Sequence, residues 1–165
     1  MKPGLVVEIP GFGPVRIKTV LTDFTGTLSF VGVLRPGVVD RLRRLNRIVD
    51  VEVLTSDSFG TARDELAKVP LVPKILSHAA DGVALEKRVI AEGHDLASVA
   101  AFGNGRNDRL MLQAVREGGG LAIAVDNGEG CAVEAMLSAN VFVVGSENAL
   151  DLLLHPIRLK ATLRD

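Results

Sequence analysis

Asp23 stands where an apolar, β-branched run ends and a turn of small residues, Thr25-Gly26-Thr27, begins. A carboxylate at the carboxyl end of a buried strand is suited to attack a phosphoryl group, because Gly26 frees the next turn to point its N–H groups inward. The same stretch, 21–28, is also consistent with an ordinary polar turn, since Asp, Thr and Gly are common turn residues. Taken alone, it leaves both interpretations open.

The apolar runs predict the elements that must position Asp23. Strands are predicted at 15–21, 49–54, 71–76, 98–102, 121–125 and 141–144, and helices at 36–48, 59–69, 82–92, 109–116 and 132–137, followed by a helical tail at 149–163 with a break at Pro156. The run 5–9 predicts a hairpin with 15–21, and Pro73 places 71–76 near a sheet edge. Strands that alternate with helices predict the α/β class, as a three-layer, doubly wound, Rossmann-like parallel sheet. Ligands of such sheets bind outside the carboxyl ends of the strands.

Composition narrows the class of protein. The 165 residues predict a single domain, 1–165, and 47% hydrophobic with 24% charged residues is a globular composition. A net charge of -1 argues against a nucleic-acid-binding surface built on bulk charge. Cys131 is the only cysteine, and the chain has neither a long apolar run nor a signal-peptide pattern. We therefore expect a cytoplasmic protein without a membrane or nucleic-acid partner.

Four separated residues complete the pattern: Asp23, Thr55 at a predicted strand end, Lys87 early in a predicted helix, and Asp108. In order and separation they resemble the motifs of the haloacid dehalogenase (HAD) superfamily of phosphotransferases, over nearly the whole chain. The spelling Asp-Phe-Thr-Gly-Thr-Leu at 23–28 is similar to the phosphorylation motif of P-type ATPases, and 54–57 looks like their second motif. The segment 103–108 resembles their hinge motif, with Asn104 where an Asp is usual.

The resemblance implies a HAD-like fold and a Mg²⁺-dependent phosphatase or phosphotransferase. Asp23 would attack phosphorus and form an aspartyl-phosphate, Thr55 would donate its hydroxyl to the phosphoryl group, and Lys87 would neutralise the oxygens that meet there. Each of these residues also has a structural alternative, Thr55 as a helix cap and Lys87 as a solvated lysine.

The resemblance also implies a metal site and an anion site. The implied ligands of Mg²⁺ are Asp23, Asp108 and the backbone carbonyl of Thr25, with Asn104 beside them. The phosphate would be cradled by Phe24, Gly26, Thr27, Ser56 and Asn107. Asn104 and Asn107 are also compatible with a simple turn.

Two departures from the family pattern affect the expected activity. Most phosphatases of this family carry an acid two residues after the nucleophile, as general acid and base, and here that residue is Thr25. Losing such a group typically costs about 10²–10⁴-fold in rate, so we expect slow turnover of alkyl phosphates. Asn104 removes one negative charge, which leaves Asp23, Asp108 and Lys87 with a summed charge of -1 before Mg²⁺ binds.

The short loops predict a protein without a cap domain. Only 26 residues separate Leu28 from Thr55, and the usual cap positions, 29–35 and 77–81, are short. An open site suits a phosphorylated small molecule or macromolecule, or a homo-oligomer that covers it. Because Thr25 replaces the acid, a second hypothesis is a phosphate-binding regulatory module of the same fold. The lone histidines at 78, 94 and 155 and the arginines at 41, 43, 44 and 47 are predicted to be structural or solvated.

Overall fold

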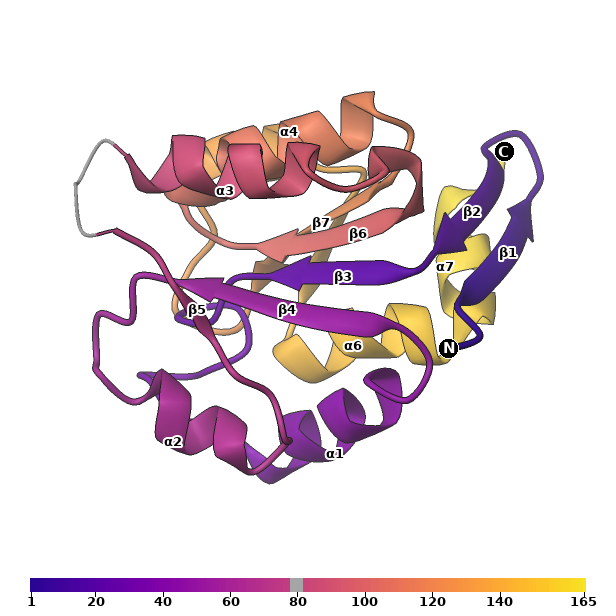
Figure 1. Ribbon diagram of the computed structural model, residues 1–165. Coiled ribbons are helices and arrows are strands. Elements are labelled where there is room, and N and C mark those ends of the chain that lie inside the picture. The colour runs from indigo at the N-terminus through magenta and orange to yellow at the C-terminus, as the bar shows by residue number, and fades with distance from the viewer. Residues whose placement is uncertain (78–81) are drawn as a thin grey trace.

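Six strands form one parallel sheet at the centre of the protein, in the order β5-β4-β3-β6-β7-β8 (Figure 1). The computed structural model describes residues 1–77 and 82–165. The strands are β3 (Thr19–Thr22), β4 (Asp50–Thr55), β5 (Lys74–Ile75), β6 (Val99–Gly103), β7 (Leu121–Asp126) and β8 (Val141–Val144). From β3 the chain winds to β4 and β5 on one side, then to β6, β7 and β8 on the other, so the winding reverses between β3 and β6. This arrangement confirms the predicted doubly wound α/β fold.

Helices cover both faces of the sheet and create two apolar cores (Figure 1). One face carries α3 (Val83–Glu92), α4 (Arg109–Glu117) and α5 (Val133–Leu137), and the other carries α1 (Pro36–Leu45), α2 (Ala62–Ala67) and α6 (Ser146–Leu154). Two short 3₁₀ helices, η1 (Leu96–Ser98) and η2 (Arg106–Asp108), flank β6. Because β6 and β7 are covered on both faces, they have the near-continuous apolar sequences typical of parallel strands.

The predicted N-terminal hairpin is present as a separate antiparallel sheet of β1 (Leu5–Ile9) and β2 (Gly13–Ile17). It packs against the C-terminal helix α7 (Pro156–Leu163), and the N–H of Asp165 donates to the carbonyl of Pro10 at 3.1 Å. The predicted strand 15–21 is two strands, because the chain leaves the hairpin at Lys18. The N–H of Lys18 donates to the carbonyl of Ser98 at 2.8 Å, which starts β3 in the central sheet.

The least regular part of the sheet is β5, which has two residues where 71–76 was predicted. Its edge position is confirmed, and Pro73, which lacks an N–H group, stops pairing before Lys74. His78 and all but the first residue of the predicted cap position 77–81 lie outside the described residues. In the described part of the chain, none of the helices has the length and apolar character needed to cross a membrane.

A charge cluster around the buried Asp151 joins α1 to α6 and α7, and it corrects the prediction that Arg41 lies on a solvated face. Arg41 donates to both carboxylate oxygens of Asp151 at 2.9 and 3.1 Å, and Arg158 donates to the same side chain at 3.3 Å. Burial favours the neutral form of Asp151, but the hydrogen bonds from Arg41 outweigh it and hold the pKa of Asp151 below its ordinary value. The cluster therefore binds the helical layer together through charged side chains.

We expect Asp151→Asn to lower the free energy of unfolding at neutral pH by about 1–3 kcal/mol, because Arg41 would keep its charge and lose its carboxylate partner. Chemical denaturation measures this change. The matched control is Asp50→Asn, since the Asp50 side chain is 70% exposed and its pairing with Lys2 is a surface ion pair. Equal effects of the two substitutions would show that the Asp151 cluster contributes nothing beyond a surface pair.

Candidate active site

Asp23 follows the last residue of β3 at the point where the winding of the sheet reverses. The N–H of Asp23 donates to the carbonyl of Phe102 in β6 at 3.0 Å, and only 6% of the residue is exposed. The chain then turns so tightly that the carbonyl of Phe24 accepts from the N–H groups of Thr27, Leu28 and Ser29. This turn holds the carboxylate of Asp23 at the carboxyl end of the sheet, where doubly wound folds bind ligands.

Gly26 is required in this turn for two reasons. Its φ of +79° is a left-handed conformation that residues with side chains rarely adopt. A Cβ atom at this position would also lie 2.4 Å from the amide nitrogen of Asn104. The glycine therefore lets the loop that follows β6 approach the loop that bears Asp23.

Lys87 joins the two acids of the site. It reaches across from α3 and donates to Asp23 Oδ1 at 2.9 Å and to Asp108 Oδ1 at 2.7 Å, and its side chain is 1% exposed. The other oxygen of Asp108 accepts from the backbone N–H groups of Asn104 and Gly105 at 3.0 and 2.9 Å. The prediction that Lys87, rather than another lysine, meets Asp23 thus agrees with the geometry, and the solvated alternative is wrong.

This triad of Asp23, Lys87 and Asp108 has an excess of negative charge. Burial, and then the charge of Asp108, raise the pKa of Asp23 to about 6, against the opposing effects of Lys87 and Thr27. Burial also disfavours the ammonium form of Lys87, but Asp108 and Asp23 outweigh it and hold the pKa of Lys87 above its ordinary value. The ammonium form of Lys87 is therefore favoured. The positive charge around Asp23 is too small to offset the effects of burial and of Asp108 on its pKa.

Thr55 ends β4, the strand adjacent to β3, and is 2% exposed. Its Oγ1 accepts the N–H of Asp57 at 2.9 Å, and among the described residues its hydroxyl hydrogen has no acceptor. Asp57 reaches this position through a left-handed φ of 55°. The arrangement leaves the Thr55 hydroxyl able to donate to a ligand, in addition to any role as a cap.

The hydroxyls of the Asp23 turn differ in their partners. Thr27 donates to Asp23 Oδ2 at 3.1 Å and lies 3.3 Å from the amide oxygen of Asn104. The Oγ1 atom of Thr25 is buried and has no hydrogen-bond partner among the described residues. A buried hydroxyl without a partner is uncommon, and here it lies two residues from Asp23.

Not every predicted residue joins this group. Phe24 is fully buried in the core, so its side chain does not face a phosphate, and a role for its backbone N–H stays a prediction. Asn107 is exposed, and within residues 1–77 and 82–165 no hydrogen bond joins its side chain or that of Ser56 to Asp23. The assignment of Ser56 and Asn107 to phosphate binding stays a prediction.

The oxygen atoms around Asp23 fit a hard cation such as Mg²⁺. In the described part of the chain, no three His, Cys, Asp or Glu side chains gather as ligands, so amide and carbonyl oxygens would have to contribute. Asp23, the amide oxygen of Asn104 and the carbonyl of Thr25 are such donors, and the charge of -1 on the triad calls for a cation. Asp108 accepts from Lys87 and two N–H groups, and Asp23 likewise accepts from Lys87 and Thr27, so the role of Asp108 as a direct metal ligand stays a prediction.

Sequence reasoning missed the contacts that fix the loop after Asp23. Asn127, which follows β7, donates to the carbonyl of Ser29 at 2.7 Å, and the Ser146 hydroxyl, at the start of α6, donates to the carbonyl of Thr27. No local pattern reveals these partners, because they are about 100 residues away along the chain. They tie the Asp23 loop to the far half of the sheet.

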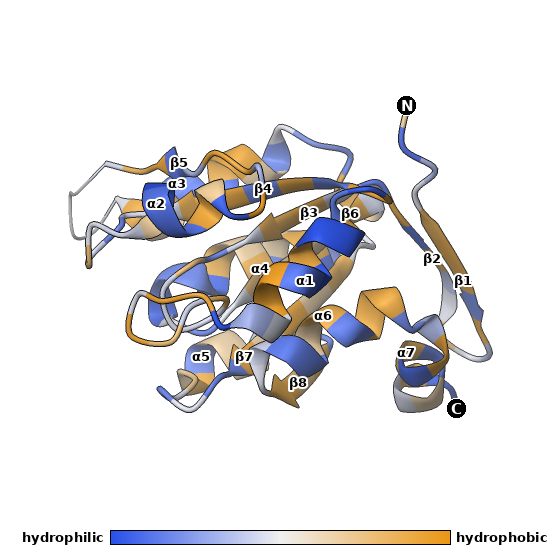
Figure 2. Ribbon diagram, turned by 90° about the horizontal axis from the view of Figure 1, so that it is seen from below, coloured by the Kyte–Doolittle hydropathy of each residue, from blue (hydrophilic) through white to orange (hydrophobic). Residues whose placement is uncertain are grey.

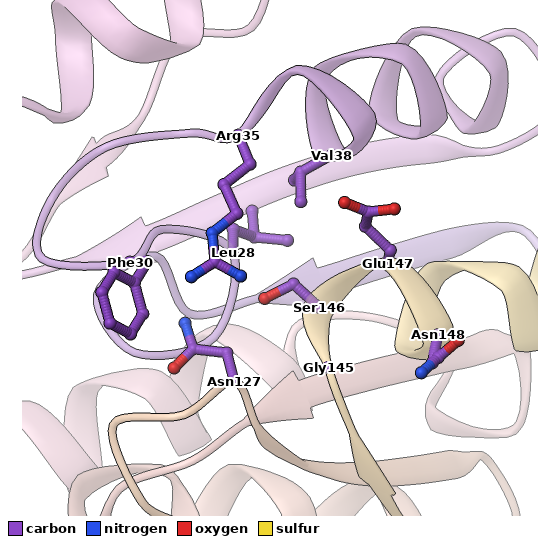
Figure 3. Close-up of a pocket in the computed structure, with 9 residues that line it drawn as sticks. All are labelled: Leu28, Phe30, Arg35, Val38, Asn127, Gly145, Ser146, Glu147 and Asn148. Atoms are coloured by element: carbon purple, nitrogen blue, oxygen red, sulfur yellow. The ribbon is translucent and has the colours of Figure 1, made fainter.

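A cavity of about 220 Å³ lies beside these contacts, between the loop that follows Asp23 and the start of α6 (Figure 3). Its lining includes Phe30, Arg35, Asn127 and Ser146, but none of Asp23, Thr55 and Lys87. The guanidinium of Arg35 sits 4.5 Å from the centre of the Phe30 ring. We therefore place the chemistry at the buried triad and treat this cavity as a neighbouring feature.

Solved structures resemble nearly the whole chain. The cobalt-bound deoxy-D-mannose-octulosonate 8-phosphate phosphatase (YrbI) of Haemophilus influenzae has a TM-score of 0.64 at 13% identity, covering 90% of this chain and 94% of its own. A protein of Streptomyces avermitilis, described as a HAD family hydrolase, has a TM-score of 0.61 at 20% identity, covering 86% and 93%. The chain has the HAD fold.

A third structure with the HAD fold is the 3-deoxy-D-manno-octulosonate 8-phosphate phosphatase of Moraxella catarrhalis, in complex with magnesium, phosphate and KDO. Its TM-score is 0.58 at 16% identity, with 84% of this chain and 86% of that chain covered. At these identities the likeness establishes the HAD fold, and the similarity to P-type ATPase motifs stays a prediction.

Two sequence comparisons complement the structures. No protein-family model matches the chain. The uncharacterized protein MJ0073 of Methanocaldococcus jannaschii is 43% identical over 67 residues, which are 41% of this chain and 68% of that protein. The two proteins belong to one family.

We expect Asn104→Asp to tighten Mg²⁺ binding to the phosphate-free protein by about tenfold, because it adds a second carboxylate close to Asp23. Isothermal titration with MgCl₂ measures the change. Asn107→Asp is the matched control, since it adds the same charge at an exposed position three residues further along. Equal or weaker binding by Asn104→Asp would contradict the placement of Asn104 at the metal.

Proposed function

We propose that this protein is a Mg²⁺-dependent phosphatase or phosphotransferase that acts through an aspartyl-phosphate at Asp23. The observation that carries the proposal is the buried triad, in which Lys87 holds Asp23 and Asp108 at the switch point of the HAD fold. A lysine with two carboxylates contributes little to stability in such a place, because burying three charges is costly. The burial of this triad is explained if its charged side chains bind a charged substrate.

Asp23 performs the covalent step. One of its carboxylate oxygens bonds to phosphorus as the bond from phosphorus to the leaving-group oxygen breaks. Water then attacks the same phosphorus, the bond to Asp23 breaks, and inorganic phosphate leaves with the carboxylate restored. In a phosphotransferase, the hydroxyl of an acceptor takes the place of water.

The other residues stabilise charge around phosphorus. Lys87 places its ammonium 2.9 Å from Asp23 Oδ1, where the phosphoryl oxygens also arrive. Thr55 donates its hydroxyl hydrogen to one of these oxygens, and Asp108 keeps Lys87 in position. When bound, Mg²⁺ would supply further positive charge toward the phosphoryl oxygens, held by Asp23, Asn104 and the Thr25 carbonyl.

Proteins of the same fold support this choice of substrate and metal. Two of those compared above are phosphatases of an octulosonate 8-phosphate, one in complex with magnesium and phosphate and the other bound to cobalt. The shared element is a phosphate ester and a divalent cation. Nothing in the described site of this chain identifies the sugar acid as its substrate.

One observation favours a second function. Because Thr25 cannot act as an acid or base, phospho-Asp23 would be long-lived, and the protein could work as a phosphate-binding regulatory module. The two functions share the phosphorylated state and differ in its lifetime.

Incubation with Mg²⁺ and acetyl phosphate tests both functions. Intact-protein mass spectrometry detects a covalent phosphoryl group, peptide mapping locates it, and a colorimetric assay follows phosphate release. Turnover with the label on the peptide that contains Asp23 supports the enzyme, and a stable label without release supports the module. Absence of any label and any release would contradict the enzyme and a module that works through phospho-Asp23.

A further inference from the structure

The leaving group of this reaction would depart without a proton from the protein. Within the described residues, Lys87 is the titratable group that contacts Asp23, and Asp108 accepts from the same ammonium. Lys87 directs its ammonium toward two carboxylates, at 2.9 and 2.7 Å, rather than toward a leaving group. Thr25, in the position of the usual acid, has a hydroxyl that does not ionise in the physiological range. A leaving group that departs as an anion must be weakly basic, such as a phenolate or a carboxylate.

Exposed apolar side chains lie on the two loops that follow β3 and β4. The chain after Ser29 forms a small hairpin, in which the N–H of Phe30 donates to the carbonyl of Val33 at 2.9 Å and the N–H of Val33 donates back at 3.1 Å. Val31 and Val33 are each 52% exposed and Phe59 is 50% exposed, whereas the ring of Phe30 lines the neighbouring cavity under the guanidinium of Arg35. We call Val31, Val33 and Phe59 the apolar rim. Figure 2 shows the loop into α1 as hydrophobic along much of its length.

The apolar rim lies at the carboxyl ends of the strands, as the triad does. Its hairpin follows Asp23 and the β3 strand, and Phe59 follows Thr55 and the adjacent β4 strand. The two loops touch, because the Thr61 hydroxyl donates to the carbonyl of Gly32 at 2.6 Å and a Cβ at Gly32 would lie 2.9 Å from that of Phe59. The rim is thus continuous with the two loops that carry the nucleophile and the predicted phosphate donor.

Val31 is an unfavourable residue for the position it occupies. Its φ is 49° and that of the following Gly32 is 77°, a left-handed pair that hairpin turns usually fill with Asn-Gly or Asp-Gly. A β-branched side chain is strained there, and more than half of this one faces water. Asn would relieve the strain and suit the solvent. Keeping an apolar side chain at this tip is explained if it contacts an apolar ligand.

We propose that the substrate is the phosphate monoester of a phenol, with its ring bound on the apolar rim. The proposal rests on the proposed function of Asp23. It joins two separate observations, the absence of a proton donor among the described groups at Asp23 and the exposed apolar residues beside it. In the first step Asp23 bonds to phosphorus, the bond to the phenolic oxygen breaks, and its electron pair leaves with a phenolate that takes its proton from water.

Four substrates distinguish the effect of the leaving group on the rate from the effect of the ring. Phenyl phosphate has both a weakly basic leaving group and a ring, 2-phenylethyl phosphate has only the ring, acetyl phosphate has only the leaving group, and glycerol 3-phosphate has neither. We expect the rate of Asp23 phosphorylation per unit substrate to be at least about 10²-fold higher with phenyl phosphate than with 2-phenylethyl phosphate. O-phosphotyrosine and a tyrosine-phosphorylated peptide then distinguish a free phenol ester from one in a polypeptide.

Substitutions in the apolar rim test whether this surface binds the phenyl ring of the substrate. In Val31→Asn and Phe59→Ser we expect the ratio of the phenyl phosphate rate to the acetyl phosphate rate to fall by about tenfold. Val31→Asn keeps the turn and should melt no lower than the wild type, so a loss of the ratio is not a loss of the fold. Phe142→Ser is the matched control, because Phe142 is an exposed phenylalanine, 43%, on the edge strand β8.

Each remaining outcome overturns the inference in a recognisable way. Phosphorylation by acetyl phosphate with no preference for phenyl phosphate would leave the proposed function intact and refute the substrate class. An unchanged ratio together with a changed oligomeric state in Val31→Asn would show that the rim is a subunit interface. His78 lies outside the described residues, so His78→Gln is included. A rise in the phenyl to 2-phenylethyl ratio in that variant would identify His78 as the proton donor and refute the proposal.

Discussion

Asp23→Asn reduces phosphate release by at least about 10⁴-fold and abolishes the covalent phosphoryl label, because an amide cannot serve as the nucleophile. The amide keeps the size of the side chain, and Lys87 retains its contact with Asp108 at 2.7 Å. The fold should therefore survive the change. Initial rates with acetyl phosphate and Mg²⁺, read beside intact-protein mass spectra, measure the effect.

Asp95→Asn is the control for this substitution. Asp95 is exposed and precedes η1, at the opposite end of the sheet from Asp23, so its replacement should leave the rate within about twofold of the wild type. Release that persists at more than a hundredth of the wild-type rate in Asp23→Asn would exclude Asp23 as the nucleophile. Other side chains of the carboxyl edge would then have to be considered.

Thr25→Asp has the second large expected effect, an increase of about 10²–10⁴-fold in the hydrolysis of phospho-Asp23 and in the turnover of alkyl phosphates. The new carboxyl group would replace a buried hydroxyl that has no hydrogen-bond partner among the described residues. It lies two residues after Asp23 along the chain. It could take a proton from the attacking water and give one to an alkoxide. Single-turnover decay of the labelled protein, followed after removal of acetyl phosphate, isolates the first of these effects.

Thr25→Asn separates proton transfer from shape. Asn resembles Asp in size but cannot exchange a proton near neutral pH, so it should not accelerate the decay. A similar acceleration by both variants would show that Thr25 restrains hydrolysis by packing. No acceleration by Thr25→Asp would mean that water already reaches phospho-Asp23 with another base, and the regulatory alternative would lose its support.

Local patterns were sufficient to predict the parallel sheet and to raise Asp23 as a candidate, whereas the resemblance to the HAD motifs singled out Thr55, Lys87 and Asp108. The reason is that strands buried on both faces are written as continuous apolar runs, and the polar residues that interrupt them fall at one edge of the sheet. Lys87 was distinguishable from other lysines only because it precedes β6 on a helix. Helix ends were less accurate, as at α1, which ends at Leu45 rather than near residue 48.

Contacts between distant residues could not be predicted in this way. Arg41 belongs to a run of arginines that is typical of a solvated helix face, yet it pairs with Asp151, which is 110 residues away. Nothing near Asp108 signals that two N–H groups and Lys87 already occupy its oxygens. The strain at Val31 could not be predicted either, because the sequence around it allows the left-handed φ angle but does not require it.

The bridge made by Lys87 also bears on how the protein folds. It joins side chains that are 64 and 21 residues apart along the chain, so it forms only after β3, α3 and β6 have come together. Helices assemble faster than such distant pairings, because a long loop must close before its contacts can stabilise it. During refolding, the capacity to become phosphorylated should therefore return after most of the helical circular-dichroism signal. Phosphorylation of Asp23 would then report when the sheet is complete.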